Sequence, residues 1–316
     1  MSVNVEFHAS QWPDAVAAQL QSSLQSGIVP GRFLYDSPAQ STRWLQYHEE
    51  WSPARTAAEV RALYDRAFTA ALDDIESIPL QYVSLGCGGG QKDAAWAKAA
   101  QARCRRVVLT DTSPSLVLLA GQAVTRAGAF DVHRMVVDLT AWPDRCAYHV
   151  EEKPTIWACL GILPNFAHDR LLPYLASLMK PEDRLVLSAN LSPAPYAQAS
   201  AKIVPMYDNP LAFAWYNGAL VELGIARAQC RLIHEKLDDT GDIWRMRYVA
   251  TLQETTKLDV HGEAVTLLNS TDLEVFQSTR YTPECLPSLL RDAGLMLRQA
   301  FVDSSREEGV YLLSRE

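Results

Sequence analysis

A glycine-rich string follows a short strand-like run near residue 86. Gln81–Leu85 predicts a buried strand, and Gly86-Cys87-Gly88-Gly89-Gly90 follows it directly. Glycine lets the backbone turn sharply and lets a ligand approach without a Cβ in the way. In dinucleotide-binding enzymes, a loop of this kind holds a pyrophosphate at a helix N-terminus. Gln91 stands where the nicotinamide pattern G-x-G-x-x-G has its last glycine. The string therefore indicates a nucleotide-type ligand but disfavours a nicotinamide.

Two acids stand where the next two predicted strands end. Asp111 follows Val107–Thr110, and Asp138 follows His133–Val137 and precedes Leu139. An acid at the first point can accept both hydroxyls of an adenosyl ribose, although it also suits a helix N-cap. Asp138 could accept the adenine amino group while Leu139 packs against the ring, or it could be an ordinary loop acid. Glycines, Asp and Asp-apolar at three successive strand ends are typical of class I S-adenosylmethionine (SAM) methyltransferases, and ligands bind at such strand ends.

Strands and helices alternate around these residues. Strand patterns lie at 81–85, 107–110, 133–137, 155–160 and 185–190, and helical patterns lie at 93–102, 115–127 and 171–179. This alternation predicts parallel β-α-β units. We therefore expect an α/β fold with a Rossmann-like sheet of the class I methyltransferase type.

The alternation stops after Asn190, where Pro193 and Pro195 mark a boundary. Residues 230–236 and 243–253 alternate apolar and polar side chains around a turn sequence, which predicts an antiparallel hairpin. Two strand patterns near the C-terminus close the chain. We expect a SAM-binding Rossmann-like domain from residues 57–192 and 281–316, and a smaller α+β substrate-binding domain from residues 1–56 and 193–280.

The composition of the chain restricts the classes of partner that it could bind. The 316 residues are 48% apolar and carry a formal net charge of −8, which disfavours a nucleic-acid partner because phosphate binding needs clustered Lys and Arg. None of the six cysteines stands at C-x-x-C spacing, so no metal site is predicted. With no leader pattern and no run of about 18 apolar residues, we expect a cytoplasmic protein with reduced thiols, no membrane partner and a small-molecule substrate. No oligomeric state is predicted.

Four short strings, in order along most of the chain, resemble one family. They are Pro30–Asp36 (PGRFLYD), Trp51–Arg55 (WSPAR), Leu160–Phe166 (LGILPNF) and Pro205–Asp208 (PMYD). They resemble the P-P-K-x-F-Y-D, Y-Y-P-T-R, L-G-x-x-x-G-N and A-Y-D-D strings of the histidine Nα-methyltransferase family of ergothioneine biosynthesis. That family also includes fungal dimethylallyltryptophan N-methyltransferases. The resemblance implies a Rossmann-like domain and a substrate domain built from the N-terminal segment and a late insert.

The resemblance also implies roles for individual residues. The cofactor residues are Gly86, Gly88, Lys92, Asp111, Asp138 and Leu139. Tyr35, Asn165 and Tyr207 would hold the amino and carboxylate groups of an amino-acid substrate, and Trp51 would lie near its side chain. Asn165 and Tyr35 would be the catalytic pair, since an amide can orient a neutral amine without carrying charge. Asn165 could instead be a turn residue, and the tyrosines could be ordinary half-buried residues.

One position departs from the family. Its histidine-specific members carry an acid and a serine two residues apart on a late strand, and the pair binds the imidazole. Here the serine is present as Ser278, but Phe276 replaces the acid. An unpaired imidazole N–H would cost about 1–3 kcal/mol. We therefore expect a substrate with an apolar or aromatic side chain rather than histidine, although Phe276 could also be a simple core residue.

These observations predict a SAM-dependent N-methyltransferase that acts on the amino group of an amino acid or related small amine and releases S-adenosylhomocysteine. Methyl transfer needs a nucleophile lone pair aligned at about 3–3.5 Å from the methyl carbon, and solvent can take the amine proton. The alternatives are O-, S- or C-methylation of a small metabolite, a nucleotide-cofactor oxidoreductase, and a SAM-binding protein without activity.

Overall fold

The structure is a computed structural model that describes residues 4–76 and 79–316. Residues 1–3 and 77–78, which fall within the two predicted domains, lie outside the described residues.

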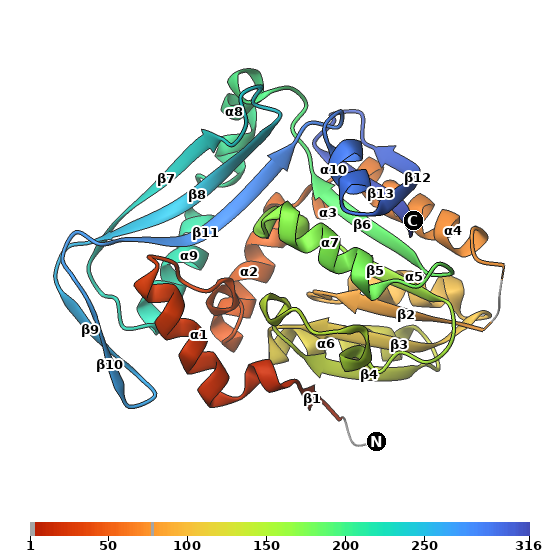
Figure 1. The fold of residues 1–316 in the computed structure, drawn as a ribbon, viewed down its shortest axis with the longest axis horizontal. Coiled ribbons are helices and arrows are strands. Elements are labelled where there is room, and N and C mark those ends of the chain that lie inside the picture. Colours follow the sequence, from red (N-terminus) through yellow and green to blue (C-terminus); the bar gives the residue numbers. More distant parts are fainter. Residues whose placement is uncertain (1–3, 77–78) are drawn as a thin grey trace.

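An eight-stranded sheet forms the larger part of the fold, in the order β1-β4-β3-β2-β5-β6-β13-β12 (Figure 1). In that order the strands are Glu6–Phe7, Asp131–Val136, Cys104–Asp111, Leu80–Leu85, Thr155–Cys159, Arg184–Asn190, Glu308–Arg315 and Leu295–Val302. The strands from β1 to β6 are parallel, and β13 runs antiparallel to both of its neighbours. The order reverses between β2 and β5, which is the switch point where open α/β sheets bind ligands. The predicted Rossmann-like α/β fold is confirmed.

Helices cover both faces of this sheet. On one face α4 (Ala58–Asp73), α5 (Gln91–Ala100) and α6 (Pro114–Ala127) bury one apolar core. On the other, α7 (His168–Leu178) and α10 (Leu286–Asp292) bury a second. All six residues of β2 are buried, because a parallel strand covered on both faces has no solvent side.

The smaller part of the fold contains two antiparallel sheets and four helices longer than one turn. The strands are β7 (Ala228–Lys236), β8 (Ile243–Leu252), β9 (Thr256–Val260), β10 (Glu263–Leu267) and β11 (Asp272–Tyr281), with sheet orders β11-β8-β7 and β10-β9. The helices are α1 (Pro13–Gln25), α2 (Pro38–Trp51), α8 (Tyr196–Ile203) and α9 (Pro210–Glu222), and they share a third apolar core with the strands. The predicted β7–β8 hairpin is confirmed, whereas the domain boundaries stay a prediction.

Short helices complete the chain between these elements. They are α3 (Pro53–Thr56) and the 3-10 turns η1 (Ala9–Gln11), η2 (Gly31–Leu34), η3 (Leu139–Ala141), η4 (Arg145–Tyr148), η5 (Leu163–Asn165) and η6 (Val204–Met206). No helix among the described residues is long and apolar enough to cross a membrane.

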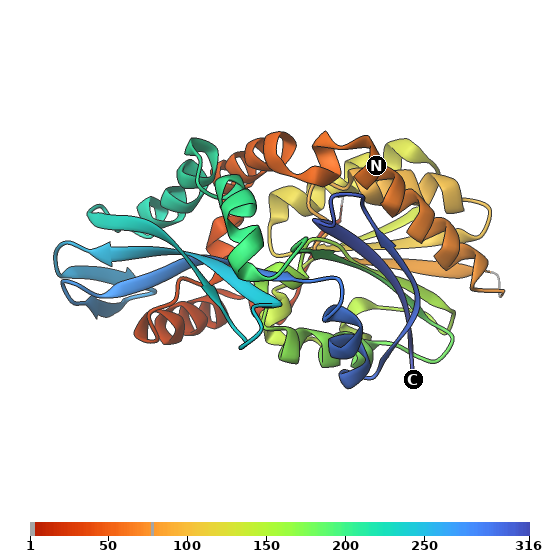
Figure 2. The ribbon, with the colours of Figure 1, turned by 90° about the horizontal axis from the view of Figure 1, so that it is seen from above.

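The two parts meet at the carboxyl ends of the parallel strands (Figure 2). β11 contacts η5 and β6, and a bridge joins Leu191, just after β6, to Tyr281 at the end of β11. The N-terminal segment also reaches the large sheet, because Ser10 Oγ accepts a hydrogen bond from the backbone N–H of Asp138 at 3.1 Å. The strand ends are thus enclosed by the N-terminal segment and by the late insert.

Gly90 permits the close approach of α5 and α6. Its φ is +73°, and a Cβ there would lie 2.3 Å from Ala120 Cα. Gly262, between β9 and β10, has a similar φ of +85° but open space around its Cα. Gly90 and Gly262 therefore distinguish the two reasons why a position requires glycine, which are a positive φ and the lack of room for a Cβ.

We expect Gly90→Ala to destabilise the protein by roughly 2–5 kcal/mol, from left-handed backbone strain together with overpacking. Gly262→Ala should cost only the backbone part, roughly 1–2 kcal/mol. Denaturant unfolding of both variants measures the difference. Equal losses would show that α6 yields to the added methyl group.

Candidate functional site

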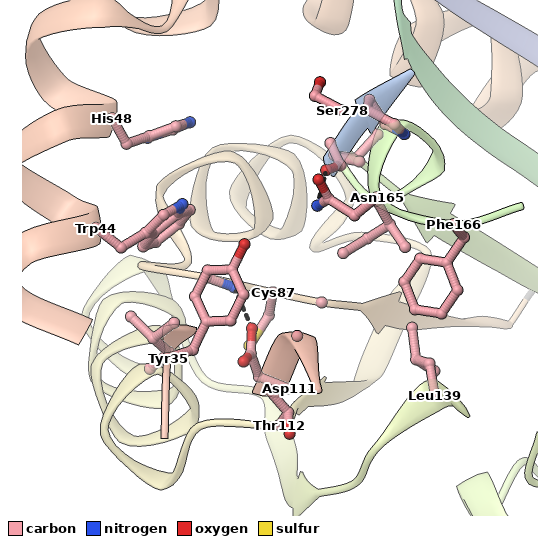
Figure 3. Close-up of a pocket in the computed structure, with 18 of the residues that line it drawn as sticks. Tyr35, Trp44, His48, Cys87, Asp111, Thr112, Leu139, Asn165, Phe166 and Ser278 are labelled. Carbon is pink, nitrogen blue, oxygen red and sulfur yellow. Dashed lines mark hydrogen bonds between the residues drawn. The ribbon is translucent and has the colours of Figure 1, made fainter. Parts of the chain in front are cut away.

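A cavity of about 690 Å³ opens at the carboxyl ends of the parallel strands (Figure 3). Every residue that the sequence analysis singled out lines it. These residues are Tyr35, Trp51, Gly86, Gly88, Lys92, Asp111, Asp138, Leu139, Asn165, Tyr207, Phe276 and Ser278. They come from the N-terminal segment, from the ends of β2, β3, β4 and β5, and from the late insert. The structure therefore brings the predicted residues together, and their individual roles stay predictions.

The glycine loop passes from β2 into α5 along the wall of the cavity. Gly88 has a φ of +52°, and a Cβ there would lie 2.8 Å from the Trp44 ring. The Cys87 N–H donates to Thr110 O at 2.8 Å, which fastens the loop to β3. The loop thus exposes backbone rather than side chain at its closest point to the indole of Trp44.

Asp111 connects this loop to the next strand end. Its two carboxylate oxygens accept the backbone N–H groups of Gly88 and Ser113, each at 3.0 Å. Ser113 itself is the N-cap of α6, because its hydroxyl accepts from Leu116 N. Burial raises the pKa of Asp111 to about 6, and the backbone hydrogen bonds oppose that rise. The carboxylate therefore retains lone pairs beside the cavity, where a ribose diol could donate to them.

Asp138 already has partners in this structure. Its Oδ1 accepts from the N–H and the hydroxyl of Thr140, at 2.8 and 2.7 Å, and its Oδ2 accepts from Gln19 Nε2 at 2.8 Å. Asp138 is thus the N-cap of η3, which agrees with the alternative that it is an ordinary loop acid. The Gln19 amide is nevertheless the same kind of donor as an adenine amino group, so the adenine role stays a prediction.

Lys92 belongs to a buried polar group beneath the glycine loop. Its Nζ lies 3.7 Å from the centre of the Tyr64 ring, and the Tyr64 hydroxyl donates to Glu308. Burial lowers the pKa of Lys92 to about 8, although the Glu308 carboxylate opposes that fall. Burial also raises the pKa of Glu308, which Lys92 lowers in turn. A cationic Lys92 at neutral pH suits an anionic ligand group at this end of the cavity.

Aromatic rings form another part of the cavity wall. The Tyr35 ring centre lies 5.8 Å from that of Trp44 and 5.5 Å from that of Trp215. Burial raises the pKa of Tyr35 above its ordinary value, and Asp111 adds to the rise, so the hydroxyl stays protonated. Phe276 stacks on Tyr216 with ring centres 4.6 Å apart. Phe276 is therefore both a core residue of the smaller part and a cavity wall.

Asn165 ends η5 and has a weakly held side chain. Its Nδ2 lies 3.5 Å from Gly161 O, at the upper limit for a hydrogen bond. Its backbone is better fixed, because its N–H donates to Ile162 O and its carbonyl accepts from Gln277 Nε2 at 3.2 Å. The residue is thus a turn residue whose amide can still serve a ligand.

A buried cation orders the hydroxyls at the inner end of the cavity. Arg280 is 1% exposed, and its Nη2 donates to the Tyr207 hydroxyl at 2.9 Å. Asn190 Nδ2 lies 3.4 Å from the same oxygen, and Ser278 Oγ lies 2.9 Å from it. Since Tyr207 accepts from Arg280 and Asn190, its own proton points to Ser278. The Ser278 proton then has no acceptor among the described residues and is available to a ligand.

The sequence analysis missed Arg280 and His48. Arg280 could have been found, because Phe276, Ser278 and Arg280 alternate along one strand and share a face. His48 lies on α2, which the sequence analysis did not predict, although Ser37 before Pro38 is good N-cap chemistry. The His48 ring stacks on Trp44 with centres 4.9 Å apart, and its Nδ1 accepts from Arg55 Nε at 3.4 Å.

Comparison with known proteins gives structural likeness alone. No protein-family model and no curated protein sequence matches the chain. A SAM-dependent methyltransferase from Clostridium acetobutylicum is 12% identical, with 87% of this chain and 98% of that chain covered and a TM-score of 0.47. The 1,6-didemethyltoxoflavin-N1-methyltransferase of Burkholderia thailandensis is 15% identical, with 96% and 90% covered and a TM-score of 0.45. The N-methyltransferase NodS of Bradyrhizobium japonicum is 9% identical, with 86% and 98% covered and a TM-score of 0.42. At such values the likeness assigns no activity to this chain.

The environment of His48 predicts a pH-dependent stability. Burial, with Lys92 and Arg55 adding to it, lowers the pKa of His48 to about 3 from an ordinary 6.5. Between these values the unfolded chain binds a proton that the folded protein does not. The free energy of unfolding should therefore fall as pH drops below about 6.5, with a slope that approaches about 1.4 kcal/mol per pH unit. His48→Gln should remove this part of the slope in denaturant titrations at pH 7 and pH 5. Parallel stability curves for the two proteins would contradict it.

Proposed function

We propose that the protein is a SAM-dependent methyltransferase that transfers a methyl group to the amino group of an amino acid or related small amine. The observation that carries the proposal is the arrangement of one cavity. The glycine loop, Asp111 and Asp138 lie at the ends of the neighbouring strands β2, β3 and β4. Asn165 lies at the end of η5, the short helix that follows β5.

The residues present suit an adenosyl cofactor. The Asp111 carboxylate, whose two oxygens each accept one backbone N–H, still has lone pairs for a ribose diol. Leu139 is buried beside Asp138 and offers an apolar surface to a purine. Lys92 is suited to the carboxylate of the methionyl group. When bound, SAM supplies an electrophilic methyl group on a sulfonium.

The chain's own residues would position the nucleophile. The amine gives its lone pair to the methyl carbon as the carbon–sulfur bond breaks, so the ammonium must first lose a proton to solvent. The Asn165 amide and the Tyr35 hydroxyl can orient the neutral amine without adding charge. Such alignment at about 3–3.5 Å is the main contribution expected of the protein.

The inner end of the cavity restricts the substrate. Arg280 directs the Tyr207 proton to Ser278, so Ser278 offers a donor to the ligand. Phe276 beside it offers only an apolar ring. These features favour a substrate with an aromatic or apolar side chain and a hydrogen-bond acceptor near it, and they disfavour histidine, as the missing acid already indicated.

O-methylation is the second candidate. His48 lines the cavity and stays neutral at physiological pH because burial lowers its pKa. Because its Nδ1 accepts from Arg55, the neutral ring carries its proton on Nε2, which can donate a hydrogen bond to a substrate oxygen and orient it. The site of methylation on the product distinguishes the two candidates.

Methylation of a panel of amino acids and amines with SAM, read by mass spectrometry, tests the proposed function. Asp111→Asn should weaken SAM binding roughly ten-fold or more in calorimetry, since a charge-assisted hydrogen-bond pair is lost. Wild-type affinity should also fall as pH drops through about 6, where Asp111 takes up a proton.

Asn165→Ala is the matched variant for this experiment. It should leave SAM affinity within about two-fold and lower turnover by about 100-fold, because it disturbs alignment only. Unchanged SAM affinity in folded Asp111→Asn would refute the cofactor site. Unchanged turnover in Asn165→Ala would show that this residue serves only the turn.

Phe276→Glu tests the specificity. The wild-type protein should methylate a substrate with an aromatic side chain in preference to histidine, and Phe276→Glu should shift relative activity toward histidine. The variant should also lose activity on the aromatic substrate, because a carboxylate would be buried among rings. Phe276→Leu, which keeps the site apolar, is the control. Efficient methylation of histidine by the wild-type protein would show that the specificity assignment is wrong.

A further inference from the structure

Two histidines and a glutamate meet at the edge of the large sheet, outside the cavity. Glu6 lies on β1, His133 on β4 and His149 directly after η4. β1 pairs with β4 so that Glu6 lies opposite Met135, which shares a sheet face with His133. Three segments that are far apart in the sequence thus bring metal-ligating side chains to one point.

The donor atoms of these side chains are closely spaced. The Glu6 carboxylate oxygens lie 3.1 Å from His133 Nε2 and 2.9 Å from His149 Nε2. One donor atom from each residue lies within 4.8 Å of the other two. Around a tetrahedral zinc ion with bonds of about 2.0–2.1 Å, neighbouring donors are about 3.3 Å apart. Small side-chain rotations would bring the three donors to that spacing.

Hydrogen bonding accounts for the position of only one of the two histidines beside Glu6. His149 Nε2 and Glu6 form a hydrogen bond, but the buried His133 Nε2 makes none, despite its 3.1 Å approach to the carboxylate. His133 Nε2 thus remains an unused ligand atom close to the same carboxylate.

We propose that Glu6, His133 and His149 form a binding site for a divalent transition-metal ion, for which Zn²⁺ is the best match. Two imidazoles and one carboxylate are a recognised zinc donor set, with a fourth position for water. Imidazole disfavours Mg²⁺ and Ca²⁺, which prefer oxygen ligands. The bound ion fastens β1 to β4 and so fixes the N-terminal segment, whose Ser10 and Gln19 contact Asp138 beside the cavity.

Calorimetry with ZnCl₂ on chelator-stripped, full-length protein tests this site. The wild-type protein should bind one equivalent, and its melting temperature should rise with zinc. His133→Ala and His149→Ala should each weaken binding roughly ten-fold or more. His261→Ala is the matched control, because His261 also faces a carboxylate, 3.3 Å from Asp14, but has no second histidine in its group. Its zinc affinity should match the wild-type value within about two-fold.

Two further measurements keep the result interpretable. Co²⁺ should give the visible absorption of a tetrahedral nitrogen and oxygen site, and Glu6→Gln should weaken it while leaving the metal-free melting temperature close to that of the wild type. The metal-free melting temperatures of the histidine variants show whether they fold. Wild-type protein that binds no stoichiometric zinc overturns the proposal. Zinc binding that is equal in the wild type, His133→Ala and His149→Ala overturns it as well.

Discussion

The Asp111 carboxylate joins two strand ends on which the cavity depends. It accepts the Gly88 N–H from the loop after β2 and the Ser113 N–H from the start of α6. The Ser113 hydroxyl in turn contacts Ser41 Oγ on α2 at 2.8 Å. Asp111 therefore holds the glycine loop directly and is linked to α2 through the Ser113–Ser41 pair. Burial of a charge without such donors would be costly, so the same contacts that shape the loop also keep the acid ionisable.

The late insert contributes a second buried charge, and its position explains why the insert and the large sheet act together. Arg280 Nη1 donates to Leu191 O at 2.9 Å, just beyond β6, while its Nη2 donates to Tyr207. The guanidinium thus connects the end of a sheet strand to the inner end of the cavity. An arginine suits this position because its rigid fork binds several acceptors at once.

Local sequence could predict the large sheet, because strand and helix periods, glycines and strand-end acids each report on neighbours along the chain. The same reasoning found the β7–β8 hairpin, where Asp238 accepts the Gly241 N–H at 2.7 Å in the turn. It could not find β1, which has two residues and exists only because β4 lies beside it. It also missed α2, because the many polar residues of this helix obscure its apolar face. Trp44 and His48, which lie on α2, were therefore missed as well. Gln19, which donates to Asp138, and Tyr207, which accepts from Arg280, are each more than 70 residues away from their partner, so these two contacts follow from the tertiary fold alone.

The short strand β1 also covers part of one edge of the large sheet. A sheet edge presents unpaired N–H and C=O groups to which another chain can add. β1 covers this edge at Met135 and Val136, and its charged Glu6 discourages a further strand from joining. Loss of β1 would leave the backbone groups of Met135 and Val136 open to pairing with another chain. Two exposed residues that add nothing to the buried core thus cover part of a sheet edge.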